Sequence, residues 1–123
     1  IRYICLFLQM RYHSNRKLMR RPEIVKRIAE AIKRVAPDAK TILYGSEARG
    51  DARPDSDIDL LVLLEGENRL SLNRQMEITS PLYDIELETG VSISPMVMLK
   101  KDWENRPFRT PFYINVVNEG IVL

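Results

Sequence analysis

One apolar run, from Ile58 to Leu64, most constrains what this chain can fold into. Six of its seven residues are aliphatic, and Asp59 is the single interruption. A run without polar alternation is typical of a strand that is covered on both faces, because a half-exposed strand alternates apolar and polar residues. We therefore expect Ile58–Leu64 to be a central strand. Asp59 then needs a partner, since burying an unpaired carboxylate is costly.

The segments around this run predict a mixed α+β fold, a small sheet flanked by helices. Apolar residues at helical spacing predict a helix from Pro22 to Val35 with a basic outer side. Thr41–Tyr44 is β-branched and aromatic, and predicts a strand that ends in a tight turn at Gly45. Two charged turns are expected between Glu47 and Asp55.

The second half of the chain continues the alternation of helix and strand. Leu72–Thr89 is predicted to be mainly helical, with a kink or restart at Pro81, although its last residues also fit a strand. Val91–Leu99 predicts a third strand, which Pro95 makes irregular or places at an edge. Thr110 and Pro111 begin a last helix that runs to Glu119, and residues 121–123 are expected to return to the sheet.

The length of 123 residues allows one domain and one active site. Residues 21–123 carry the regular pattern and are expected to be that domain. Residues 1–20 show no sustained period, and we expect them to be an N-terminal extension that is poorly ordered or non-native. The apolar runs are far too short to cross a bilayer, and the first lacks a secretory cleavage site, so a cytoplasmic protein without a membrane partner is expected.

Composition and charge exclude several classes of function. A single cysteine, Cys5, and a single histidine, His13, exclude an intramolecular disulfide and a Cys/His zinc site, so oxygen atoms would have to hold any metal. Residues 1–40 carry 11 Lys and Arg against 3 Asp and Glu, whereas residues 41–123 carry 8 against 14. The basic part could attract a nucleic acid, but a solvated basic helix face is the favoured interpretation, and we do not expect a nucleic-acid partner.

Two clusters of chemically active residues stand close together in the sequence. The first is Gly45-Ser46-Glu47-Ala48-Arg49-Gly50, and the second is Ser56-Asp57-Ile58-Asp59, with ten residues between Ser46 and Asp57. Residues two apart in a strand point to the same face, so Asp57 and Asp59 direct both carboxylates to one place. Mg²⁺ commonly binds one or two carboxylates and completes its shell with substrate phosphates. The second cluster therefore predicts a metal site.

The first cluster has the features of a phosphate site. Gly45 allows the backbone to approach a bulky anion closely, and Ser46 offers a hydroxyl and an N–H group at an expected helix start. Arg49, one helical turn further on, supplies a guanidinium for phosphate oxygens. Either cluster alone fits a plain turn or a strand end equally well, but the two together favour adjoining metal and phosphate sites.

The Gly-Ser pair, the ten-residue spacing and the Asp-x-Asp pair resemble the minimal nucleotidyltransferase domains of the polymerase-beta-like superfamily. The resemblance covers residues 21–123. It implies transfer of a nucleoside monophosphate, AMP from ATP, with Mg²⁺ as cofactor. It also implies that Gly45, Ser46 and Arg49 bind the triphosphate and that Asp57 and Asp59 are the catalytic metal ligands. Such domains often act as antitoxins of a helical HEPN-type partner, some by adding AMP to it.

The sequence departs from this family pattern at one place. Active members usually carry a third carboxylate on the next strand, where it helps to activate the attacking hydroxyl, but this chain has Ser92 and Ser94 there. Asp84, Glu86 or Glu88 could substitute, although solvated helix carboxylates are the favoured interpretation. Two hypotheses follow: a nucleotidyltransferase that modifies a protein, or a weakened nucleotide-binding module that neutralises a helical partner by contact alone.

Overall fold

A computed structural model of the chain describes residues 19–123. The expectations for Cys5, His13 and the greater part of the N-terminal extension lie outside these residues. The elements follow in the order α2 (Pro22–Val35), β1 (Lys40–Tyr44), α3 (Ser46–Arg49), β2 (Ile58–Leu64), α4 (Leu72–Thr89), β3 (Ile93–Leu99), α5 (Lys100–Glu104), α6 (Pro111–Glu119) and β4 (Ile121–Val122). The mixed α+β class predicted from the sequence is confirmed.

The four strands form one mixed sheet in the order β3-β2-β1-β4. β1 pairs antiparallel with both β2 and β4, whereas β2 and β3 are parallel and are joined through the crossover helix α4. The aliphatic run is therefore an interior strand, as its lack of polar alternation predicts. β3 lies at an edge, where the missing N–H of Pro95 is tolerated.

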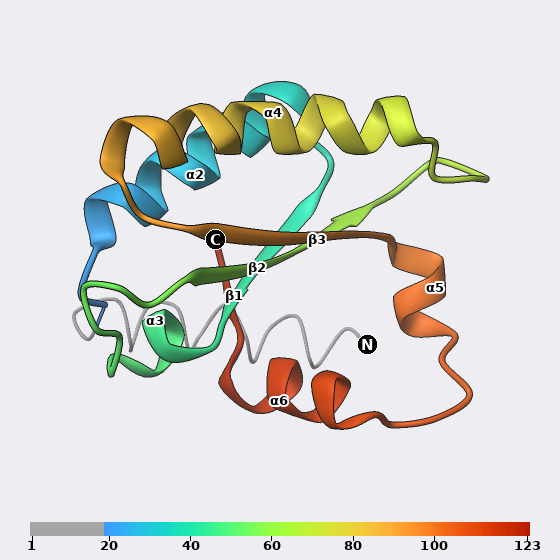
Figure 1. The fold of residues 1–123 in the computed structure, drawn as a ribbon. Helices are drawn as coiled ribbons and strands as arrows, with labels where there is room; N and C mark the ends of the chain where they lie inside the picture. Colours follow the sequence, from blue (N-terminus) through green and yellow to red (C-terminus); the bar gives the residue numbers. More distant parts are fainter. Residues whose placement is uncertain (1–18) are drawn as a thin grey trace.

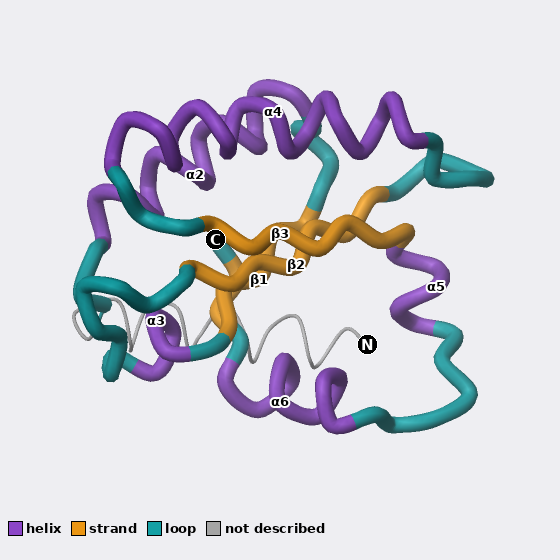
Figure 2. Tube along the Cα trace, in the orientation of Figure 1, coloured by secondary structure: helices purple, strands orange, loops and turns teal. Residues whose placement is uncertain are grey.

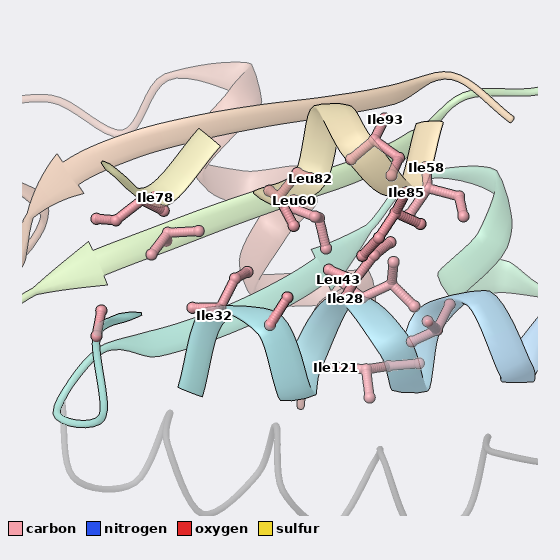
Figure 3. Close-up of a cluster of buried hydrophobic side chains, with 14 of the residues drawn as sticks. Ile28, Ile32, Leu43, Ile58, Leu60, Ile78, Leu82, Ile85, Ile93 and Ile121 are labelled. Atoms are coloured by element: carbon pink, nitrogen blue, oxygen red, sulfur yellow. The ribbon is translucent and has the colours of Figure 1, made fainter. Parts of the chain in front are cut away.

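Helices cover both faces of the sheet (Figure 1). α2 and α4 lie on one face, and α5 and α6 lie on the other. Alternate residues of β2 divide between two cores accordingly: Leu60, Val62 and Leu64 pack with α2 and α4, and Leu61 and Leu63 pack with Trp103 and Val116. The larger core gathers the residues labelled in Figure 3: Ile28, Ile32, Leu43, Ile58, Leu60, Ile78, Leu82, Ile85, Ile93 and Ile121.

Local signals account for most of the helix boundaries. The side chain of Thr110 caps α6 by accepting a hydrogen bond from the Tyr113 N–H, with Pro111 at the first helical position. α4 passes through Pro81 without a break and ends at Gly90 in the left-handed conformation. The chain beyond Gly45 forms one helical turn, α3, before the loop into β2, and α5 was not predicted, because five residues are too few to show a period.

The end of β1 and the starts of β2 and β3 meet at one end of the sheet, next to α3 (Figure 2). The tight turn of Gly45 lies here, and so does the loop that enters β2. The fold therefore brings together the two sequence clusters. In the described part of the chain, no helix is long and apolar enough to span a membrane.

Candidate active site

A row of three polar side chains crosses the sheet at this end. Asp59 in β2 is paired with Tyr44 of β1 on one side and with Ser94 of β3 on the other. Residues paired in register point to the same face. Asp59 has the same parity in β2 as Leu61 and Leu63, so the row lies on the face that α5 and α6 cover elsewhere. The acidic interruption of the aliphatic run therefore belongs to this face and not to the larger core.

Gly45 lies directly against the carboxylate of Asp59. A Cβ atom added to Gly45 would come within 2.4 Å of Asp59 Oδ2, which is closer than real Cβ contacts allow. The backbone of Gly45 also has φ +79° and ψ −157°, a conformation that is almost exclusive to glycine. The close contact and the backbone conformation each require glycine at position 45. The contact also brings the Gly-Ser pair and the Asp-x-Asp pair together, as predicted.

Asp57 lies one residue before β2 and is exposed. Its Oδ2 atom accepts a hydrogen bond from the hydroxyl of Ser94 at 3.3 Å, which ties it to the neighbouring strand. The following residue, Ile58, donates its N–H to the carbonyl of Ser92 at 2.9 Å, so the backbone around the Asp-x-Asp pair is fixed by the pairing of β2 with β3. The two carboxylates are thus held at the same sheet end.

The Asp59 carboxylate is half-buried, and no hydrogen bond to it is present within residues 19–123. Burial raises the pKa of Asp59, the negative charge of Asp57 raises it further, and the positive charge of Arg49 lowers it in part. Burial, with a contribution from the Asp59 charge, also raises the pKa of Tyr44. The described residues therefore do not fully compensate the negative charge of ionised Asp59, and a bound cation would compensate it.

The expected phosphate contacts are arranged around the same turn. Ser46 is the first residue of α3, immediately after Gly45. The guanidinium of Arg49 is half-exposed and forms ion pairs with Glu119 at 2.8 Å and with Asp51 at 3.2 Å. These two hydrogen bonds raise the pKa of Arg49. The positive charge of Arg49 thus acts on Asp59, but the guanidinium itself is ion-paired with Glu119 and Asp51.

Sequence reasoning missed the contribution of Glu119. This residue ends α6, one residue (Gly120) separates it from β4, and β4 pairs with β1. The expected return of residues 121–123 to the sheet was the signal that could have revealed the position of Glu119. A strand antiparallel to β1 begins at the sheet end where β1 stops, so the residues just before that strand lie near Gly45. The order of the strands was not evident from the sequence.

Glu47 lies inside the first cluster but faces away from the site. Its side chain is fully buried and accepts hydrogen bonds from the N–H groups of Arg20 and Arg21 at 2.6 and 2.9 Å and from Arg21 Nε at 2.6 Å. Met19 is also buried against the main core. Glu47 therefore fastens the start of α2 to α3, which is a structural role.

None of the alternative carboxylates completes the site. Glu86 accepts a hydrogen bond from the N–H of Ile93 at 2.8 Å, and Glu88 forms an ion pair with Arg27. Asp84 lies on α4 beside the groove between α2 and α4. Within residues 19–123, no group of three or more acidic, histidine or cysteine side chains could hold a metal ion. Ser94 stands at the register position next to Asp59, where a third carboxylate was expected.

Comparisons with known proteins identify the family to which the chain is similar. Residues 25–123 match the family model described as a nucleotidyltransferase domain. A "Putative protein adenylyltransferase" of Methanocaldococcus jannaschii is 30% identical over 101 residues, which cover 80% of this chain and 94% of that protein. A "Bifunctional uridylyltransferase/uridylyl-removing enzyme" of Pseudomonas aeruginosa is 39% identical over 57 residues, 46% of this chain. That match spans only 6% of the length of the Pseudomonas protein.

The fold and the matched residues together define the class. The match to the family model covers most of the chain and includes both clusters, so the chain belongs to the nucleotidyltransferase domain family.

Proposed function

We propose that this protein transfers a nucleoside monophosphate, AMP from ATP, to a hydroxyl group of another protein in a Mg²⁺-dependent reaction. The observation that carries the proposal is the contact between Gly45 and Asp59. It places a half-buried carboxylate without a hydrogen bond from the described residues against a tight glycine turn at the start of α3. An unpaired carboxylate beside a tight glycine turn suits a cation that carries phosphate.

The residues present fit a magnesium ion. Asp57 and Asp59 offer carboxylate oxygens, and the Ser94 hydroxyl lies beside Asp57. This is the hard oxygen donor set that Mg²⁺ prefers, and two carboxylates leave room for the phosphates of a nucleotide. When bound, the ion would neutralise charge on the phosphates and on the pyrophosphate leaving group.

The protein's own residues would orient the reactants. Gly45 and Ser46 would border the triphosphate, and Arg49, whose positive charge acts on Asp59, would exchange a carboxylate partner for phosphate oxygens. In the transfer, the acceptor oxygen forms a bond to the α-phosphorus, and the bond from that phosphorus to pyrophosphate breaks. The hydroxyl proton of the acceptor passes to solvent water. Ser94, unlike a carboxylate, does not take up this proton at neutral pH, so we expect slow turnover.

The relative from Methanocaldococcus jannaschii supports an adenylyl group and a protein acceptor. The match extends over 94% of that protein, which is named for this activity. The resemblance to minimal nucleotidyltransferases extends the proposal to the partner. We propose a HEPN-type helical toxin as the acceptor and an antitoxin role for this chain. ATP is the proposed nucleotide.

A second candidate function is neutralisation of the same partner by contact alone, with the nucleotide bound but not transferred. Ser94 is the observation that favours it, because this serine occupies the place of the third carboxylate. The two candidates differ in whether the covalent step occurs. They share the nucleotide site.

The decisive experiment is incubation of the protein with ATP labelled at the α-phosphate, Mg²⁺ and a purified HEPN-type partner. We expect label on the partner with the wild type and with Asp55→Asn, a control in the exposed loop before Asp57. Asp57→Asn should transfer at least a hundredfold less. Ser94→Asp, which restores a third carboxylate, should transfer faster.

The outcomes separate the candidates. Binding of Mg²⁺-ATP without transfer, together with suppression of the partner by Asp57→Asn, would favour the second candidate. Equal labelling by the wild type and Asp57→Asn, or no nucleotide binding at all, would contradict the proposed site.

A further inference from the structure

An apolar stripe on α4 has no function in the site described above. It consists of Leu72, Met76, Tyr83 and Leu87, whose side chains are 70%, 57%, 58% and 67% exposed. At 100° per residue, the four positions fall within an arc of about 60° on the helix surface. The residues that α4 buries, Ile78, Leu82 and Ile85, lie on a different face. Large apolar side chains that gather on one exposed face mark an interaction surface.

We propose that the α4 stripe, defined by these four residues, is the interface of a symmetric dimer with a second copy of this chain. The spacing of the stripe is palindromic about a point between Thr79 and Ser80. When two copies of α4 pack antiparallel around a two-fold axis at that point, Leu72 faces Leu87 of the second copy, and Met76 faces Tyr83. A two-fold interface has to be self-complementary in this way, whereas a surface for an unrelated partner has no reason to be palindromic.

The side chains near the proposed axis permit close packing. Thr79 and Ser80 are small, so the two helix backbones can approach each other between the four larger pairs. Glu77, the charged residue closest to the axis, is paired with Arg74 at 3.0 Å. Glu86 is engaged by the N–H of Ile93. Asp84 lies about 60° around the helix from Leu87, beside the groove between α2 and α4, so its exposed carboxylate does not have to be buried along the stripe.

The exposed area is sufficient for a specific but weak dimer. Side chains of this size expose roughly 150–250 Å² each when free, so at these exposures the stripe presents on the order of 500 Å² per copy. Two copies would bury about 1,000 Å², which is the lower bound for a specific interface, and a dissociation constant in the micromolar range is expected. Figure 1 shows α4 along the outside of the molecule, on the opposite face of the sheet from α5 and α6. The row of Tyr44, Asp59 and Ser94 lies on the α5–α6 face, so both sites of the dimer would stay accessible.

Sedimentation equilibrium of the full chain tests the proposal. The wild type should be a dimer at about 100 μM, and Met76→Glu and Tyr83→Glu should each raise the dissociation constant at least a hundredfold, because each carboxylate meets an apolar side chain across the axis. Phe108→Glu is the matched control, since Phe108 is 77% exposed but lies outside the stripe. Far-UV circular dichroism of all variants checks that they are folded.

Cross-linking tests the register. In a chain carrying Cys5→Ser, a mixture of Met76→Cys and Tyr83→Cys proteins should form a disulfide between the two variants faster than either forms with itself. A monomeric wild type at 100 μM, or a dimer that Met76→Glu and Tyr83→Glu leave unchanged, would overturn the proposal. So would a monomer that binds a different protein through the stripe.

Discussion

Two acidic side chains, Glu47 and Asp59, show how differently this fold treats a carboxylate in its interior. Glu47 is fully buried and accepts three hydrogen bonds from Arg20 and Arg21. Asp59 is half-buried, accepts none from the described residues, and has a raised pKa because of burial and the charge of Asp57. A carboxylate whose oxygens are satisfied by the protein holds the structure together, whereas one that is left unsatisfied is available to a ligand.

The largest expected effect concerns Glu47. Glu47→Ala should lower the free energy of unfolding by about 3–5 kcal/mol, because it leaves the buried guanidinium of Arg21 without its partner. The two terminal nitrogens of Arg21 already lack hydrogen-bond partners among residues 19–123. Chemical denaturation measures the loss. Glu77→Ala is the control, since its exposed ion pair should contribute less than about 1 kcal/mol. A loss for Glu47→Ala as small as that of the control would remove the structural role assigned to Glu47.

The second effect concerns the glycine next to Asp59. Gly45→Ala should cost about 1–3 kcal/mol of stability through backbone strain. It should also abolish Mg²⁺-ATP binding, because the new Cβ displaces the Asp59 carboxylate. Gly66→Ala is a matched control, with φ +78° and no atom within 4 Å of an added Cβ. It should be destabilised by strain but should bind nucleotide normally. Calorimetry measures the binding of both variants. If Gly45→Ala also binds Mg²⁺-ATP normally, Gly45 is not part of the nucleotide site.

The smallest effect is on the pH dependence of stability without metal. The pKa of Asp59 in the folded protein is raised above its ordinary value of 3.8, so folding favours the protonated form. The wild type should therefore lose stability as the pH rises through the raised pKa. Asp59→Asn, which keeps the side chain neutral, should melt a few degrees higher than the wild type at pH 7. This gain should vanish below pH 3.8. An unchanged or lower melting temperature at pH 7 would mean that the ionised carboxylate is compensated in the fold.

The same comparison shows what the sequence could and could not predict. The aliphatic run predicted β2 with its acidic interruption, and Thr110-Pro111 predicted the start of α6, because both depend on neighbours in the sequence. That the two clusters adjoin was predicted from their positions at the ends of two strands and from the family resemblance, whereas the direct contact of Gly45 with Asp59 was not predicted. Glu47 could not be assigned in this way. Its partners lie 26 and 27 residues upstream, in a segment without a pattern, and only tertiary packing reveals them.

The site shows the same division between local and distant signals. Asp57, Asp59, Gly45 and Ser46 were predicted from two short clusters. The pairing of Ser94 with Asp59 required the parallel register of β2 and β3, and the pairing of Arg49 with Glu119 required β4 to lie beside β1. Strand order and register depend on long-range contacts. A single sequence carries little information about such contacts.

Titration of Mg²⁺-ATP into the wild type and Asp59→Asn, followed by melting temperature and calorimetry, tests the central claim most directly. At a hundred times its dissociation constant, the ligand should stabilise the wild type by about 2.7 kcal/mol. Asp59→Asn should show little stabilisation by Mg²⁺-ATP, while Asp55→Asn should respond like the wild type. If Asp59→Asn and the wild type bind Mg²⁺-ATP equally well, then Asp59 is not a ligand and the proposed site is wrong.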